Sequence, residues 1–208
     1  MKKRSIVYID GFNLFYGALK GTTNKWLNLE KLFYMLRKDD NIIDIKYFTA
    51  LVTGHKKDNQ EKYLLALETL PKVTTILGRF KMTSIRCTNS LCDFTGDRHF
   101  NKPEEKRTDV NIAVHMVSDA LQNKCDRIIL VSGDSDLVPS LNMIKLNFPE
   151  KEIIVYIPAR NAVRGAAVEL RSSADKNKTL PNNLLSKSQL PNPVINGDGI
   201  KIEKPESW

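Results

Sequence analysis

Long apolar runs are absent from this sequence. No stretch approaches the roughly 20 consecutive apolar residues that a membrane-spanning helix needs. The N-terminus, residues 1–4, is basic, but Asp10 ends the apolar run of residues 6–9 well short of the roughly 7–15 apolar residues of a signal peptide. We therefore expect a cytoplasmic protein that has no membrane partner.

Cysteine and histidine are also scarce, with three residues of each. An odd number of cysteines does not form a disulfide framework. The histidines share no motif, so no Ser-His-Asp arrangement is indicated. Cys87 and Cys92, with His99 nearby, could supply half of a zinc site. Their spacing is wider than the usual Cys-x-x-Cys, so we favour free or buried thiols over zinc.

Acidic residues are the minority among the charged side chains. The chain has 32 Lys and Arg against 24 Asp and Glu, which gives a formal charge of +8 and a pI of about 9.3. Such an excess favours a polyanionic partner, with nucleic acid as the first candidate and a membrane surface as the second. A basic surface that serves only solubility is the alternative.

Five short apolar runs, rich in β-branched residues, predict buried strands at residues 5–9, 42–52, 73–77, 127–131 and 152–157. Helical patterns separate these runs, and the last of them covers residues 162–171. For the helix at 109–123 we expect a buried face made of Val110, Ala113, Val114, Val117 and Leu121. Strands that alternate with helices predict an α/β fold with a mostly parallel sheet and right-handed crossovers.

Two segments depart from this alternation. Residues 82–107 contain a pair of cysteines and little periodicity, and we interpret them as an insertion or a ragged hairpin on the surface. From residue 175 onward Asn, Lys, Ser and Pro dominate the composition. We therefore expect one domain at residues 1–174, followed by an extended C-terminal tail at residues 175–208.

Four aspartates coincide at one edge of the expected sheet. Asp10 ends the first strand, Asp134 and Asp136 follow the fourth, and Asp109 begins the helix that leads into the fourth. Ligands of open α/β sheets bind at the carboxyl ends of the strands. Carboxylates held close together raise one another's pKa unless a cation lies between them, and hard oxygen ligands suit Mg²⁺ or Mn²⁺. Singly, each aspartate could be only a helix cap or a turn residue.

Three motifs in this order resemble those of NYN domains, which are PIN-like nucleases related to the flap endonucleases. They are residues 8–13 (YIDGFN), 105–113 (EKRTDVNIA) and 130–139 (LVSGDSDLVP). The resemblance spans roughly residues 4–171. It implies a PIN-like, Rossmann-like three-layer sandwich with the strand order 3-2-1-4-5.

The resemblance also implies roles for individual residues. The metal ligands would be Asp10, Asp109, Asp134 and Asp136. Asn13 would be a further catalytic residue, and Asn13 and Ser132 would support the metal or the substrate phosphate. Many family members have glycine where Arg107 stands here.

Lys106 and Arg107 precede the expected helix N-terminus, which attracts anions through its free amides and its dipole. We expect these two side chains to position the RNA backbone. Glu104 and Glu105 come directly before them, so a solvated run of mixed charges is the alternative.

The favoured function is a metal-dependent ribonuclease that hydrolyses RNA phosphodiester bonds, and we allow for a homodimer. A non-catalytic RNA-binding module with the same fold is the main alternative. A phosphatase of the haloacid-dehalogenase type ranks last, because its first strand ends in Asp-x-Asp. Here Phe12 takes the place of the second aspartate and Asn13 follows it.

Overall fold

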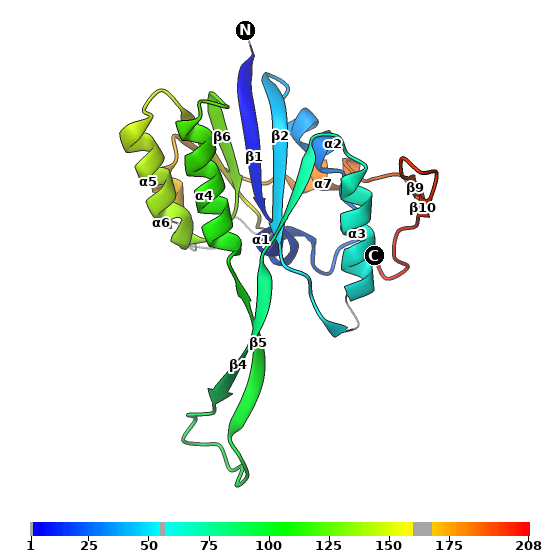
Figure 1. Cartoon of the computed structure of the whole chain (residues 1–208), viewed down its shortest axis with the longest axis vertical. Coiled ribbons are helices and arrows are strands. Elements are labelled where there is room, and N and C mark those ends of the chain that lie inside the picture. Colours follow the sequence, from blue (N-terminus) through cyan, green and yellow to red (C-terminus); the bar gives the residue numbers. More distant parts are fainter. Residues whose placement is uncertain (1, 55–56, 160–167) are drawn as a thin grey trace.

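The apolar runs of the sequence become strands of one parallel sheet in the computed structural model, which describes residues 2–54, 57–159 and 168–208 (Figure 1). Neighbouring strands of this sheet are all parallel. In spatial order they are β3 (Val73–Leu77), β2 (Asp40–Thr49), β1 (Lys3–Asp10), β6 (Arg127–Val131), β7 (Glu152–Ile157) and β8 (Lys176–Thr179).

The predicted order 3-2-1-4-5 is incomplete, because it corresponds to β3-β2-β1-β6-β7 and omits β8. The sequence of β8 is KNKT, and three of its four side chains are exposed. A polar strand at the edge of a sheet has no apolar run that would reveal it. The prediction of an extended tail from residue 175 is wrong here, since β8 pairs with β7 and the helix α7 (Asn182–Lys187) follows it.

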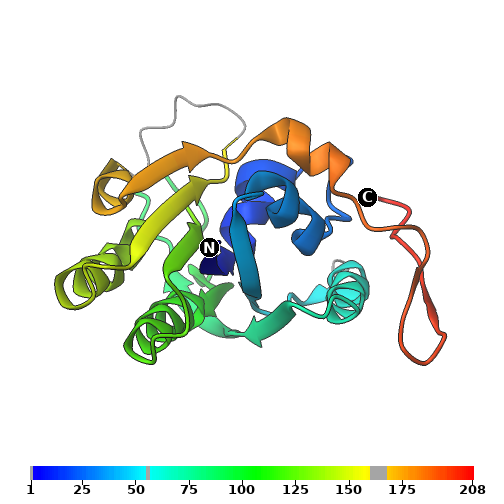
Figure 2. The same ribbon diagram turned by 90° about the horizontal axis from the view of Figure 1, so that it is seen from above.

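Helices cover both faces of the sheet (Figure 2). Successive side chains of a strand point to opposite faces, so Val7 and Ile9 of β1 join one apolar cluster while Ile6 and Tyr8 join the other. The first cluster is covered by α1 (Gly11–Leu14), the π-helical turn η1 (Phe15–Leu19), α2 (Leu29–Leu36), α3 (Lys57–Glu68) and α7. The second is covered by α4 (Thr108–Leu121), the 3-10 turn η3 (Ser135–Leu137), α5 (Val138–Asn147) and α6 (Val168–Ser173).

The helix predicted at residues 162–171 is described only from Val168 onward, as α6, and the rest of that prediction lies outside the described residues. Within the part of the chain that the structure describes, no helix is long and apolar enough to cross a membrane.

The predicted buried face of α4 is wrong for three of its five residues, whereas Ala113 and Val117 are partly buried against the second cluster. Val110, Val114 and Leu121 are 64%, 60% and 69% exposed, whereas Ile112 and Met116 are fully buried. This helix carries apolar residues around most of its circumference, so periodicity alone does not select a face. The observed orientation buries Asp119, which pairs with Lys46 and accepts a hydrogen bond of 2.8 Å from the Tyr8 hydroxyl.

A long hairpin projects from the end of the molecule where the strands of the sheet finish (Figure 1). Its antiparallel strands are β4 (Arg79–Arg86) and β5 (His99–Lys106), and we call residues 79–106 the arm. The hairpin interpretation of residues 82–107 therefore agrees with the structure, although the first strand begins earlier. Residues 181–208 run along the domain and include a small hairpin of β9 (Val194–Ile195) and β10 (Lys201–Ile202).

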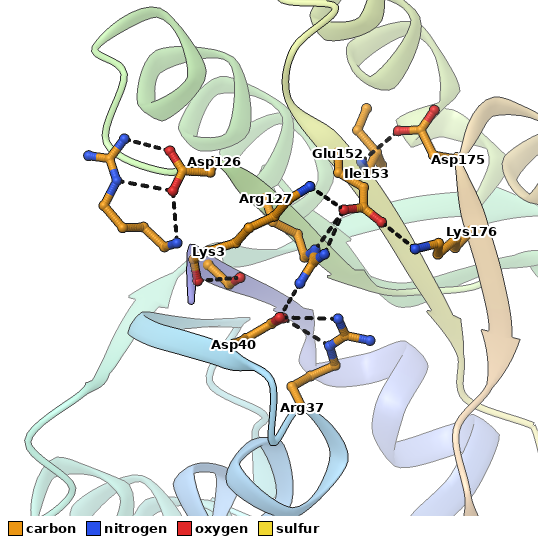
Figure 3. Close-up of polar contacts among 11 residues, drawn as sticks. Lys3, Arg37, Asp40, Asp126, Arg127, Glu152, Ile153, Asp175 and Lys176 are labelled. Carbon is orange, nitrogen blue, oxygen red and sulfur yellow. Dashed lines mark hydrogen bonds and ion pairs between the residues drawn. The ribbon is translucent and has the colours of Figure 1, made fainter. Parts of the chain in front are cut away.

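A cluster of charges joins the amino ends of the strands (Figure 3). Arg127 of β6, whose side chain is 9% exposed, pairs with Asp40 of β2 and with Glu152 of β7 at 2.6 Å. Lys3 and Lys176 each reach Glu152 at 2.8 Å. Burial opposes the charge of Glu152, but these cations dominate and lower its pKa below the usual range. The pairing therefore stabilises the fold above about pH 4.5 and is lost as the pH falls.

We expect Arg127→Met to lower the free energy of unfolding by about 1 to 3 kcal/mol, because it removes one guanidinium partner of the buried Asp40 carboxylate, which keeps its pairing with Arg37. Urea denaturation at pH 7 measures the change. Arg4→Met is the matched control, since Arg4 pairs with Asp126 on the surface and its removal should cost little. Equal effects of the two substitutions would contradict the structural role assigned to Arg127.

Candidate functional site

Asp10 is the buried centre of the candidate site. It is the last residue of β1, is 3% exposed, and caps α1 by accepting a hydrogen bond of 2.9 Å from the backbone N–H of Asn13. The next position requires glycine, because a Cβ on Gly11 would lie 2.7 Å from the carbonyl oxygen of Phe48. The sharp turn from β1 into α1 therefore holds the carboxylate in place.

Side chains from two strand ends converge on Asp10. The Ser132 hydroxyl, just after β6, donates to Oδ2 of Asp10 at 3.0 Å, and the Asn13 amide donates to the same oxygen. Oδ1 of Asn13 accepts from the backbone N–H of Gly133 at 3.1 Å. Burial raises the pKa of Asp10, while the hydrogen bonds from Asn13 and Ser132 oppose that shift. The structure thus brings three predicted site residues into direct contact.

Asp134 and Asp136 lie on the turn that follows β6. The N–H of Asp134 donates to the Ser132 hydroxyl at 3.1 Å, and Oδ1 of Asp134 accepts from the N–H of Asp136 at 3.0 Å. Asp134 therefore caps the turn η3, as the alternative interpretation expected. Its cap role does not exclude a site role, because its charge also acts on the pKa of Asp10.

Asp109 faces the same group of carboxylates from the first turn of α4. Burial, followed by the negative charges of Asp10, Asp134, Glu105 and Asp136, raises the pKa of Asp109 to about 6. The repulsion that adds to the effect of burial indicates a concentration of negative charge around Asp109. All four predicted aspartates therefore belong to one electrostatic neighbourhood.

Arg107 has an unusual backbone conformation at the start of α4. Its φ is +82°, in the left-handed region where glycine is favoured, and its side chain does not cap the helix. Asp109, which could have been only a cap residue, is instead the second residue of the helix. This left-handed conformation explains why many NYN domains, which the sequence resembles, have glycine at this position.

Lys106 forms a salt bridge of 2.9 Å with Glu104 across an exposed surface. This pair agrees with the alternative of a solvated charge run. Among the residues that the structure describes, Arg107 has no such ion pair, so its guanidinium is the better candidate for contact with a substrate.

The structure does not contain a ready-made metal cage. Within residues 2–54, 57–159 and 168–208, no group of three or more His, Cys, Asp or Glu side chains is arranged to hold a metal ion. Cys87 and Cys92 belong to no such group among the described residues, and both are free thiols. The hard oxygens and negative charges of the four aspartates suit Mg²⁺ or Mn²⁺, but Asp10 directs its carboxylate to Asn13 and Ser132.

Two cavities near these residues share Phe12 in their walls. The larger, of about 400 Å³, is lined by Gly11, Phe12, Tyr47 and Trp208 among others. The smaller, of about 270 Å³, is lined by Phe12, Asn13 and Gly133. The larger cavity cannot be found from the sequence, because apart from Gly11 and Phe12 of the first motif its walls come from segments that are far apart in the chain.

Asp109→Asn should stabilise the metal-free protein. A carboxyl group whose pKa is raised in the folded state lowers the free energy of unfolding as the pH rises from about 4 to about 6, because the group ionises more readily in the unfolded chain. The substitution should raise the free energy of unfolding by about 1 to 2 kcal/mol at pH 7.5, after allowance for partial exposure, and by little at pH 4.

Denaturation in EDTA at both pH values measures this difference. Asp93→Asn, on the exposed part of the arm, is the matched control and should change stability little at either pH. A stabilisation by Asp109→Asn that does not depend on pH would contradict the electrostatic explanation.

Comparison with known proteins identifies the family. A solved structure from Vibrio parahaemolyticus RIMD 2210633, described as a protein of unknown function VPA0982, shares the fold with a TM-score of 0.54 and 17% identity. That match covers 88% of this chain and 95% of that one.

A curated relative, 6-hydroxy-3-succinoylpyridine 3-monooxygenase HspA of Pseudomonas putida (strain DSM 28022 / S16), is 30% identical over 237 residues. The alignment covers 99% of this chain and 75% of the relative. The model of the NYN domain matches residues 4–180. With the three motifs and the carboxylates described above, this match shows that the chain belongs to the NYN domain family.

Proposed function

We propose that this protein is a metal-dependent ribonuclease with a PIN-like active site. The observation that carries the proposal is the concentration of Asp10, Asp109, Asp134 and Asp136 at the carboxyl edge of the sheet, where burial and then the neighbouring negative charges raise the pKa of Asp109 to about 6. A group of carboxylates that repel one another at neutral pH is typical of a site that receives a cation. Membership of the NYN family supports this interpretation.

The four aspartates would hold Mg²⁺ or Mn²⁺, which supplies charge neutralisation at the scissile phosphate and a more acidic water. Because the described side chains form no complete cage, binding would require Asp10 to share its carboxylate between the cation and its present donors. Asn13 and Ser132 would then orient the Asp10 carboxylate.

The N-terminus of α4 offers a place for the substrate phosphate. The positive end of its helix dipole lies there, and Arg107 stands directly before it, although the N–H of Thr108 already donates to the Glu105 carboxylate at 3.3 Å. A guanidinium can hold a phosphate with two parallel hydrogen bonds. We infer that RNA approaches along the base of the arm, where Phe80 of β4 contacts Phe12 with ring centroids 5.8 Å apart.

Asp10→Asn and Asp134→Asn should each lower the rate of RNA hydrolysis by at least about a hundredfold, since each removes a negative charge from the proposed cation site. The experiment incubates RNA and DNA with the wild-type protein and each variant in Mg²⁺, Mn²⁺ or EDTA. Asp93→Asn is the control and should retain wild-type activity.

Full activity of both variants would contradict the proposed site. Unchanged cleavage in EDTA would contradict the proposed dependence on a metal. RNA binding without cleavage by the wild-type protein in either metal would favour the alternative of a non-catalytic binding module.

Arg107→Gly separates backbone strain from substrate contact. Glycine adopts φ of +82° without steric cost, so we expect the free energy of unfolding to rise by about 0.5 to 1 kcal/mol. If the guanidinium contacts a phosphate, RNA affinity should fall and its salt dependence should become shallower by about one counterion.

Filter binding across a salt series measures both quantities. Lys106→Ala is the control, because Lys106 pairs with Glu104 and its loss should leave the salt slope nearly unchanged. Wild-type affinity and slope in Arg107→Gly would leave Arg107 with no role in binding.

Oxygenation of a small aromatic ring is a second candidate function. The alignment with the monooxygenase covers 99% of this chain, including nearly all of residues 181–208, which lie beyond the family match. A monooxygenase inserts one atom of dioxygen and reduces the other to water with two electrons from an external reductant. Dioxygen consumption with 6-hydroxy-3-succinoylpyridine and NADH or NADPH tests this function, and its absence with both reductants counts against it.

A further inference from the structure

Aromatic rings form a large part of the lining of the larger cavity, which begins at Gly11, the residue after Asp10. Phe12 and Tyr16 come from the segment after β1, Tyr47 from β2, Tyr63 from α3 and Trp208 from the far end of the chain. Its volume of about 400 Å³ falls in the range of roughly 300–1,000 Å³ that is typical of small-molecule sites. Four separate segments thus build one enclosure.

Trp208 is fixed as a wall of this cavity. Its ring lies 5.7 Å from that of Tyr63 and 6.4 Å from that of Trp26, centroid to centroid. The adjacent Ser207 accepts hydrogen bonds of 3.1 Å from Lys25 and from Asn59. The end of the chain is therefore packed and hydrogen-bonded against the domain, and the cavity has a defined shape.

Positive charge accompanies the rings. Nζ of Lys20 lies 5.0 Å from the centroid of the Tyr16 ring, and Nζ of Lys25 lies 5.9 Å from that of Trp208. Both lysines line the cavity, and no acidic side chain does so among the residues that the structure describes. Within that part of the chain neither lysine forms an ion pair with a carboxylate, so both charges are available to a ligand.

We propose that this cavity binds a single planar aromatic ring that carries an anionic group. Aromatic walls select a flat ring by stacking, and the two lysines at those walls select the negative charge. The base and phosphate of a nucleotide have this chemistry, and so does a free pyridine carboxylate. The inference rests on the cavity alone and not on the proposed cleavage of RNA.

Isothermal titration calorimetry of the full chain in EDTA tests the proposal without any contribution from a metal. The probes are 6-hydroxynicotinate, AMP and UMP, compared with nicotinamide as a ring without an anion and succinate as an anion without a ring. We expect at least one of the first three to bind saturably and the last two to bind at least about tenfold more weakly.

Tyr16→Ala should weaken the bound probe by roughly tenfold through the loss of stacking. Lys20→Gln should weaken the anionic probes more than it weakens nicotinamide. Tyr16 and Lys20 are exposed, so neither substitution threatens folding. Tyr34→Ala and Lys31→Gln, exposed on α2, are the matched controls and should bind as the wild type does.

Preference for the nucleotides assigns the cavity to a base of a nucleic acid, and preference for 6-hydroxynicotinate assigns it to a free aromatic acid. Either result supports the proposal, even in a protein that cleaves no RNA. Binding should also persist in Asp134→Asn, which separates this site from the carboxylates. No saturable binding of any ring-bearing anion, or unchanged affinity in Tyr16→Ala, would overturn the proposal.

Discussion

The hydrogen bond from the Ser132 hydroxyl to the Asp10 carboxylate joins the ends of two neighbouring parallel strands, and the candidate site depends on it. Parallel pairing puts Ile9 opposite Val131, so the residues that follow these partners emerge side by side. One carboxylate then caps α1, accepts from Asn13 and fixes the turn after β6. The buried Asp10 carboxylate can carry a charge because residues after both strands donate hydrogen bonds to it.

Ion pairs at the amino ends of the strands favour the same register. Arg127 connects the amino ends of β2, β6 and β7 through Asp40 and Glu152 (Figure 3). A shift of one residue would separate these charges and would also turn each apolar side chain to the other face. The ion cluster and the carboxylate site are thus two consequences of one alignment, with paired structural charges at one end of the strands and the carboxylates of the candidate site at the other.

Sequence reasoning recovered the parts of the fold that local chemistry dictates. The five apolar strands are clear because both faces of a parallel sheet are buried, and the four aspartates are clear because they follow or precede those strands. It failed at β8, a polar edge strand, and at α4, whose face is selected by the contact of Asp119 with Lys46 and Tyr8. The cavity was missed because Trp26, Tyr63 and Trp208 meet only in the folded chain.

Phe12 belongs to both cavities and to the base of the arm at once. Its ring is stacked on Tyr16 at 6.4 Å and lies edge-on to Phe80 at 5.8 Å. Any ligand that displaces this ring therefore acts on the hairpin, and any partner that moves the hairpin acts on the ligand. By thermodynamic linkage, the free energy by which such a ligand would shift the arm equals the free energy by which the arm would shift ligand binding.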